Sequence, residues 1–506
     1  MRLTRHKFAR ALLGAQAALA VAAGPVLAAP AGSVVLALPS EPTSVDACDD
    51  STNANARVLR GNVVEGLTRL DPKSGAVEPL LATKWSRVDD KTWTFTIRPD
   101  VKFQDGAPLD AKAVVFGINR AMDTKLVCQT LSLFSTKTVA SVEGEMVVKI
   151  TTAAPDPILP ARIAYIDLPS PATPADAKSD KPIGTGPYQF VSRDVGQSIT
   201  LKAFDGYWGS APDFRDAQYV WRAEPTVRAG MIKTGEADIA LDIPFDQTKG
   251  LGNAEEYSTN SVFFLRPMLR KPPFDDLRVR QAVVAAIDKQ TLTEVLMDHS
   301  GTPADQLVTP LINGNIAGFA GMPFDLDKAK SLLAAAKADG VPVETPVTLV
   351  ARSDLFSGSD EVAQAIQQML EDAGFKVTLK PVDAVAWSPW LRQPSSLTQP
   401  ANLLMATHDN ISGDASLSFP NYFGSAGHLS VANDPSLDTA LVSAAALDGK
   451  ARAAAYQQIA RKAYDAEIVI PVAALESRLL TSSKVSYEAN GFTDIELHLA
   501  DVKHKQ

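Results

Sequence analysis

The stretch Ile183–Trp208, IGTGPYQFVSRDVGQSITLKAFDGYW, predicts a tight turn that leads into a β-hairpin. Gly184 and Gly186 stand at the start of the turn, and we expect them to use a positive φ, which glycine reaches at little cost. The aromatic and β-branched residues in 188–191 and 198–203 predict two short strands. This part of the chain is therefore expected to form a pair of neighbouring strands.

The length and the N-terminus indicate an exported protein of several domains. A chain of 506 residues with 45% hydrophobic content can form two or three domains. Basic residues at the N-terminus precede an apolar run over residues 11–23, and small residues lead up to Ala28. This pattern predicts a Sec-type signal peptide over residues 1–28 and a periplasmic location. The net charge of −9 becomes more negative without this segment, which argues against nucleic-acid binding.

The chain contains two cysteines, Cys48 and Cys128, and both lie after the predicted cleavage site. In an oxidising compartment they are expected to form one disulfide, the alternative being two unpaired thiols.

Motifs of the common enzyme classes are missing from the sequence. It contains no GxSxG, HExxH, CxxC or GxxxxGK[S/T] pattern, so hydrolase, zinc-protease, thiol-redox and P-loop chemistry have no support. The spacing of the many carboxylates does not single out an acid/base pair. We therefore expect a protein that is not an enzyme and that needs no cofactor.

Two segments carry a family resemblance. The first runs from Leu81 to Arg120, and its matching positions are Leu81, Trp85, Asp90, Trp93, Phe95, Arg98, Val101, Phe103, Asp105, Gly106, Phe116 and Arg120. The second, DLRVRQAVVAAIDKQTL, covers residues 276–292. Together with the turn at Gly184, these segments resemble the family-5 extracytoplasmic solute-binding proteins, the peptide, dipeptide and nickel-chelate receptors of ABC importers.

The resemblance implies an α/β fold of the periplasmic-binding-protein type II kind, with two lobes, a hinge and a small inserted domain. Lobe I is expected to be discontinuous, over residues 29–70, 183–270 and 476–506. The inserted domain Ib would cover 71–182, and lobe II would cover 271–475. Alternating strands and helices in the later part predict a mostly parallel sheet in lobe II.

Apolar periodicity predicts several helices. One is expected over 57–68 and another over 278–297, the latter with one or two turns of adjustment. A third is expected over 327–338 with Asp327 at its cap, and a fourth over 111–122 with Asp110 at its cap.

The candidate ligand site lies in 403–427, where a predicted strand is followed by a polar loop, as in the ligand sites of open α/β sheets. In peptide-binding relatives this region carries an aspartate that pairs with the ligand's α-ammonium group, and Asp409 is the matching residue. Asp414 matches a second aspartate. The loop departs from the family pattern by inserting residues 411–413 and by having Ala415 in place of proline, which leaves the ligand class open. The candidate ligand-binding residues are Asp409, Asp414, Asn410, Trp387, Tyr422, Glu41 and Ser44.

Each candidate also has a structural interpretation. The aspartates can cap the loop, and Trp387 can pack the lobe edge instead of stacking on a ligand. His408 and His428 are expected to cap or pack, so no metal site is predicted.

The resemblance implies a monomeric receptor that delivers a small solute, a di- or oligopeptide by default, to an ABC permease in the membrane. A non-peptide solute such as an opine, a sugar or a nickel chelate is the first alternative. An exported enzyme or chaperone is the second.

Overall fold

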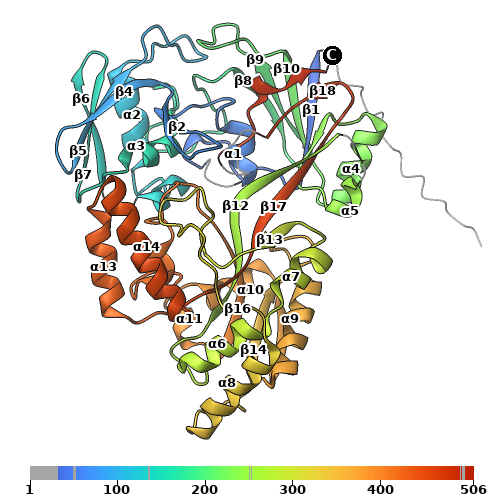
Figure 1. Ribbon diagram of the computed structural model, residues 1–506. Helices are drawn as coiled ribbons and strands as arrows, with labels where there is room; N and C mark the ends of the chain where they lie inside the picture. The colour runs from blue at the N-terminus through green and yellow to red at the C-terminus, as the bar shows by residue number, and fades with distance from the viewer. Residues whose placement is uncertain are drawn as a thin grey trace, which may run out of the picture.

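The computed structural model describes residues 32–49, 53–134, 137–249, 251, 253–489, 492 and 496–505. The predicted signal peptide lies outside these residues. Figure 1 shows two lobes, one above the other, with the long strands β12 and β17 running between them. A small sheet lies beside the upper lobe. Within the described residues, no helix combines the length and the apolar character that crossing a membrane requires.

The strands are β1 Ser33–Leu38, β2 Thr68–Leu70, β3 Val77–Pro79, β4 Ala82–Arg87, β5 Thr92–Ile97, β6 Thr138–Gly144, β7 Val147–Thr152, β8 Tyr188–Asp194, β9 Ser198–Ala203, β10 Asp216–Trp221, β11 Ile239–Ala240, β12 Ala254–Pro267, β13 Gly301–Pro303, β14 Val347–Arg352, β15 Val377–Val382, β16 Asn402–Asp409, β17 Ile470–Thr481, β18 Val485–Ser486 and β19 Lys503–His504.

The α-helices are α1 Asn53–Leu59, α2 Ala111–Ala121, α3 Leu159–Arg162, α4 Pro225–Thr234, α5 Phe245–Thr248, α6 Leu277–Ala286, α7 Lys289–Thr291, α8 Leu326–Ala338, α9 Ser359–Ala373, α10 Ala384–Leu391, α11 Ser395–Thr398, α12 Phe419–Phe423, α13 Pro435–Ala445 and α14 Gly449–Asp465. A π-helical turn at Leu292–Leu296 follows α7. Short 3-10 turns cover Ala47–Asp49, Gln129–Leu133, Ile163–Tyr165 and Leu499–Asp501.

One mixed sheet joins both lobes, in the order β15-β14-β16-β12-β17-β11-β1-β10-β9-β8, with β13 paired to β17. In the lower lobe, β14 is parallel to β15 and β16, whereas β12 is antiparallel to both β16 and β17. The parallel sheet expected there is therefore confirmed for β14, β15 and β16, whereas β12 joins them antiparallel. The βαβ pattern identified the parallel strands, but β12, which enters from the upper lobe, carries no such local signal.

A four-stranded antiparallel sheet, β4-β5-β7-β6, forms the small unit beside the upper lobe. Its strand β5 alternates strictly, and Trp93, Phe95 and Ile97 all point into the apolar core. Helix α2 packs against this sheet. The predicted cap is confirmed, because the Asp110 side chain accepts a hydrogen bond from the backbone N–H of Ala113 at 2.8 Å.

The hairpin predicted after the glycine turn is confirmed as the antiparallel pair β8 and β9. The glycines themselves serve a different purpose from the one expected. A Cβ at Gly184 would lie 2.2 Å from the carbonyl oxygen of Val63, and one at Gly186 would lie 2.4 Å from that of Asn62. Neither glycine has a positive φ, so close backbone approach explains them.

The helix predicted over 57–68 is wrong in its position, because α1 ends at Leu59. Gly61 has a φ of +68°, which interrupts the helix. The Asn62 side chain then donates to the carbonyl of Leu497 at 2.7 Å and accepts from the N–H of Leu499 at 2.8 Å. The apolar residues that suggested a helix are buried in an irregular segment instead.

Two other helices differ from the prediction at their ends. The helix expected over 278–297 is interrupted at Ile287, which is extended, and Asp288 caps a new turn by accepting from the N–H of Thr291 at 3.0 Å. Helix α8 is capped by Asp325 rather than Asp327, since the Asp325 carboxylate accepts from the N–H of Lys328 at 2.9 Å.

The predicted disulfide is confirmed. Cys48 and Cys128, which are 80 positions apart in the sequence, are bonded, with their Cα atoms 5.1 Å apart. The bond ties the loop after β1 to the end of the segment after α2. Closing so long a loop restricts the unfolded chain, and loss of such a bond typically costs about 2–5 kcal/mol.

Candidate functional site

The predicted site loop begins where β16 ends, in the lower lobe. β16 pairs with β12, and Asp409 lies opposite Ser261 at the last position of this pairing. The side chains of β16 are buried or half-buried up to His408, that of Asp409 is exposed, and the loop that follows is mostly buried. Asp409, at the end of β16 and next to β12, is therefore the first residue of this strand whose side chain is exposed.

Asn410 holds the loop in shape. Its side-chain amide donates to the carbonyl of Asp414 at 2.9 Å and to the Ser418 hydroxyl at 2.7 Å. Its side-chain oxygen accepts from the N–H of Ser412 at 3.0 Å. Asn410 is buried, and both ends of its amide are used within the loop. The Asn410 side chain therefore stabilises the conformation of the loop.

Asp414 is buried in an ion pair. The Arg452 guanidinium donates to both carboxylate oxygens, at 2.8 and 2.7 Å, and Asn313 donates to the carboxylate at 2.8 Å. Burial alone would raise the pKa of Asp414, but its contact with Arg452 outweighs burial and lowers that pKa. The loop is thereby joined to α14 through a charged pair that water does not reach.

Asp409 has a different environment. Its side chain is exposed, and within the part of the chain that the structure describes it forms no hydrogen bond or ion pair. It is the candidate whose charge is available to a ligand.

His408 and Tyr422 pack together beside Asp409. The two rings lie 4.9 Å apart, and the His408 Nε2 atom is 2.6 Å from the Ser418 hydroxyl. Burial lowers the pKa of His408 to about 4, so its imidazole is neutral at pH 7. Burial raises the pKa of the Tyr422 phenol above its ordinary range. Both side chains are therefore uncharged at pH 7, and both lie beside the end of β16.

Trp387, on α10, is buried against β16. Its indole N–H donates to the carbonyl of Met405 at 3.0 Å, and the Arg352 guanidinium lies 4.9 Å from its ring centre. Trp387 therefore packs against β16, the strand that ends at Asp409.

Glu41 and Ser44 lie on the loop after β1, in the upper lobe. Glu41 accepts from the Arg193 guanidinium at 2.6 Å and from the N–H of Gly196 at 3.0 Å. The Ser44 hydroxyl accepts from the N–H of Asp46 at 3.1 Å. These contacts stay within the upper lobe and do not join the two residues to the loop after β16.

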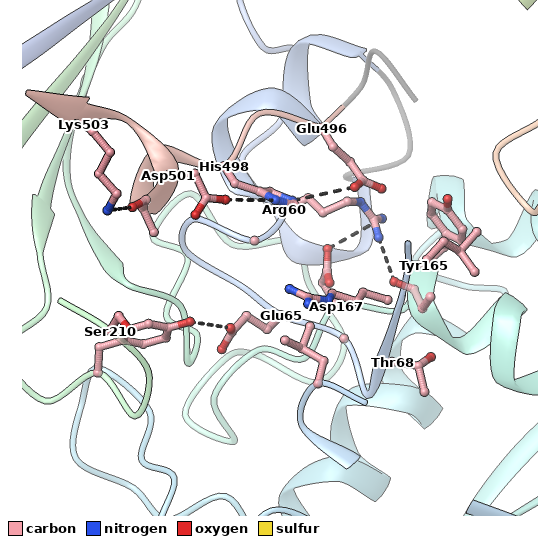
Figure 2. Close-up of a pocket in the computed structure, with 18 residues that line it drawn as sticks. Arg60, Glu65, Thr68, Tyr165, Asp167, Ser210, Glu496, His498, Asp501 and Lys503 are labelled. Carbon is pink, nitrogen blue, oxygen red and sulfur yellow. Dashed lines mark hydrogen bonds and ion pairs between the residues drawn. The ribbon is translucent and has the colours of Figure 1, made fainter. Parts of the chain in front are cut away.

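A cavity of about 390 Å³ is lined by residues of the upper lobe (Figure 2). Its walls come from the segment after α1, from β2, from the end of the turn at Tyr165, from the segment after β9, and from the C-terminal segment. Its charged and phenolic lining residues are Arg60, Glu65, Arg69, Tyr165, Asp167, Tyr207, Glu496, His498, Asp501 and Lys503. None of them was among the candidates from sequence.

Glu65 is the buried acid of this cavity. Its carboxylate accepts from the Thr185 hydroxyl at 2.7 Å, from the Trp208 indole at 2.9 Å and from the Tyr207 hydroxyl at 3.1 Å. Burial raises the pKa of Glu65 to about 7, and these donors lower it only in part. The one sequence signal was an isolated glutamate in the apolar segment NVVEGL.

Metal binding has no support in the described residues, where no group of three or more His, Cys, Asp or Glu side chains is placed to hold an ion. This agrees with the placement of His408, which packs against Tyr422 and Ser418.

Two lobes joined by crossing strands, with a polar loop at a strand end, define an extracytoplasmic solute-binding protein of the kind that serves ABC importers. Residues 76–426 match the family "Bacterial extracellular solute-binding proteins, family 5 Middle", and the chain belongs to this family. Membership makes it a binding protein and not an enzyme, as the missing motifs predicted.

Relatives with known names are similar over most of the chain. It is 32% identical over 395 residues to the glutathione-binding protein GsiB of Salmonella paratyphi A, covering 75% of this chain and 74% of that one. It is 31% identical over 372 residues to GsiB of Escherichia coli K12, covering 70% of each chain.

Solved structures share the fold. CtaP of Listeria monocytogenes superposes with a TM-score of 0.82 at 20% identity, covering 94% of this chain and 99% of that one. NikA of Brucella suis, in complex with Fe(III)-EDTA, gives 0.81 at 20% identity, with 94% and 100% covered. AgaA of A. tumefaciens R10, in complex with agropinic acid, gives 0.77 at 23% identity, with 94% and 99% covered. These likenesses confirm the predicted fold class.

Proposed function

We propose that this protein is the periplasmic receptor of an ABC importer for a short peptide, and that Asp409 pairs with the ammonium group of that peptide. The observation that carries the proposal is the exposed Asp409 carboxylate, which has no partner among the described residues, at the end of a buried strand. A carboxylate in that position pairs well with a cationic group on a ligand. The similarity to glutathione-binding relatives supports a peptide ligand.

Binding would work by closure. The proposed moving bodies are lobe I (29–70, 183–270 and 476–506) with the inserted unit 71–182, and lobe II (271–475). A ligand that contacts both bodies shifts the protein toward the closed state by its differential affinity for that state. The Arg162 guanidinium already reaches the Ser416 hydroxyl across this boundary at 3.0 Å. The closed, monomeric receptor would then dock on a membrane permease.

The test is calorimetric titration of the mature protein with reduced glutathione and with N-acetylglutathione, which lacks the ammonium group. Wild type and Asp409→Asn form a double cycle with the two ligands. We expect each change alone to weaken binding by about 1–3 kcal/mol, and the two together to add little more. Asp327→Asn, an exposed aspartate in α8, serves as the matched control and should bind like wild type.

Additive effects in this cycle would remove Asp409 from the ammonium contact while leaving the peptide receptor in place. Native mass spectrometry of protein purified from its own periplasm gives the independent check. Peptide masses would support the proposal. A single non-peptide mass, such as an opine, a sugar or a nickel chelate, would contradict the peptide assignment but not the receptor class.

A further inference from the structure

The two strands that pass between the lobes, β12 and β17, pair irregularly along their course (Figure 1). Glu256 lies opposite Arg478 in this pairing. Ser258 lies opposite Glu476, and the register shifts between Ser258 and Val262. A shift of this kind interrupts the ladder of hydrogen bonds and bends the strand that carries the extra residues. This place is therefore suited to the bending that closure of the lobes requires.

Strained backbone accompanies the irregular pairing. Asn260, inside the register shift, has a φ of +53°, and the consecutive residues Asp298 and His299 have φ values of +47° and +57°. A residue other than glycine is uncommon in this left-handed region and persists where surrounding contacts hold it. The N–H of His299 donates to the carbonyl of Thr293 at 3.0 Å, and its carbonyl accepts from the Arg478 guanidinium at 2.6 Å. Arg478 therefore helps to hold the strained segment next to β17.

Arg478 contacts both of the proposed moving bodies. It belongs to lobe I, and its guanidinium donates to the carboxylate of Glu256, in the same body, at 3.0 Å. It also donates to the Ser300 hydroxyl at 3.2 Å and to the carbonyl of His299, and both of these acceptors belong to lobe II. The Arg478 side chain is only 4% exposed, and its guanidinium lies 4.7 Å from the Phe245 ring centre. A buried guanidinium with acceptors in both bodies stabilises their contact.

Glu476 adds a second carboxyl group to this contact. Glu476 and Arg478 are two positions apart on β17, so their side chains lie on one face of the sheet, together with that of Glu256. The carboxyl groups of Glu256 and Glu476 are hydrogen-bonded to each other, which requires a proton on one of them. Partial burial and the neighbouring Glu256 raise the pKa of Glu476 to about 7, whereas the hydrogen bond from Glu476 lowers the pKa of Glu256. The pair therefore holds one shared proton at lower pH and loses it as the pH rises through about 7.

Two bases act on this pair of acids. They are Arg478, on β17, and His299, on the loop before β13. Helix α5 contributes the ring of Phe245, which packs against Arg478 and lies 5.3 Å from the His299 ring. A guanidinium binds a carboxylate more strongly than it binds a carbonyl or a hydroxyl. An ionised Glu476 therefore competes for Arg478 with the two acceptors of lobe II.

We propose that Glu256, Glu476 and Arg478 form a pH-responsive clasp at the hinge, which favours the closed receptor while the two glutamates share a proton. When that proton is lost, Glu476 draws Arg478 away from lobe II and closure becomes less favourable. The clasp acts on the closure proposed above and therefore rests on that proposed function. Because the proton is bound more tightly in the closed state, the clasp is fully effective at low pH and fails as the pH rises through about 7.

The first test needs no ligand. Small-angle X-ray scattering of the full mature protein at pH 6 and at pH 8 compares wild type with Glu476→Gln, which keeps the volume and a hydrogen-bond donor but has no proton to lose. We expect the radius of gyration of wild type to be larger at pH 8 than at pH 6, and that of the variant to be the same at both. Glu361→Gln, which alters an exposed glutamate of α9, is the control and should follow wild type. A wild type of constant radius, or a variant that expands like wild type, would overturn the clasp.

Calorimetric titration with reduced glutathione measures the consequence for binding. Between pH 6 and pH 8, the affinity of wild type should fall by up to about tenfold, the most that one proton with a pKa of about 7 can give over this range. Glu476→Gln should lose most of this difference, and the comparison of the two proteins cancels the other titrating groups, such as Glu65 and the ligand itself. Ser300→Ala removes one lobe II acceptor of Arg478 and should weaken binding about threefold at pH 6 but less at pH 8.

The two measurements separate the clasp from the transport function. Parallel pH profiles for wild type and Glu476→Gln would contradict the clasp even if glutathione binds well. If glutathione binds to none of these proteins, the peptide assignment fails, and the scattering of the ligand-free proteins still decides whether the clasp exists.

Discussion

Asp409 and Asp414 lie on the same loop, yet the structure gives their carboxylates opposite surroundings. Asp414 is buried and held by Arg452, Asn313 and the N–H of Ser416. Asp409 is exposed and has no partner in the described part of the chain. Family resemblance nominated both for ligand binding. The ion pair with Arg452 makes Asp414 a structural residue of the loop, whereas the carboxylate of Asp409 is available to a ligand.

The largest expected effect is on the buried member. Asp414→Ala leaves the Arg452 guanidinium buried without its counter-ion, and we expect it to lower the free energy of unfolding by about 3–5 kcal/mol. Urea denaturation followed by circular dichroism measures this.

The double variant Asp414→Leu with Arg452→Met is the control. It removes both charges at similar volume and should regain most of the lost stability. A loss below about 1 kcal/mol in Asp414→Ala would show that the ion pair is not what holds the loop.

The exposed member should behave in the reverse way. Asp409→Asn is expected to change the free energy of unfolding by less than about 0.5 kcal/mol, because it removes no contact. Affinity for a ligand with an ammonium group should nevertheless fall by about 1–3 kcal/mol. The same urea titration and a calorimetric titration give the two values. A large loss of stability would place Asp409 with Asp414 among the structural residues.

Glu65 extends the comparison to a buried acid without an arginine bonded to it. Its three donors are neutral, and burial raises its pKa to about 7, whereas Arg452 lowers that of Asp414. The folded state thus keeps a proton that the unfolded chain releases near the ordinary pKa of 4.5. Stability from this proton is fully present below pH 4.5 and is lost as the pH rises through 7.

Glu65→Gln imitates the protonated acid and removes this titration. Between pH 6 and pH 8, wild type should lose about 1 kcal/mol more stability than the variant does. Urea unfolding at several pH values checks it. Parallel pH curves for the two proteins would show that Glu65 is already ionised at neutral pH in the folded state.

A small loss of stability is expected from a change at Ser416, on the same loop. Its hydroxyl accepts from Arg162, but Arg162 also donates to the carbonyl of Leu133 at 2.7 Å and lies 3.3 Å from Asp156. Ser416→Ala should therefore cost only about 0.5–1.5 kcal/mol, measured by thermal unfolding. A cost equal to that of Asp414→Ala would make the Arg162 contact, and not the ion pair, the main anchor of the loop.

Sequence patterns predicted the elements whose environment is set locally. The aromatic and β-branched residues of 188–203 form the β8–β9 hairpin, and α2 begins after Asp110 because that side chain caps it. The prediction over 57–68 was wrong because Asn62 bonds to the distant C-terminal segment. Sequence also identified the loop after β16 as polar, but it could not tell Asp409 from Asp414. The residue that pairs with Asp414 is Arg452, which lies on α14, far from the loop in sequence.

The sequence by itself determined the family, the two-lobed fold class, the β8–β9 hairpin and the two cysteines that pair, because these depend on residue type and short-range spacing. The tertiary structure alone decided which carboxylates are paired, why Gly184 and Gly186 must be glycines, and how the cavity around Tyr165 is assembled. Those outcomes depend on contacts between segments far apart in the chain. Burial and charge pairing arise only when such segments meet, so no local pattern records them.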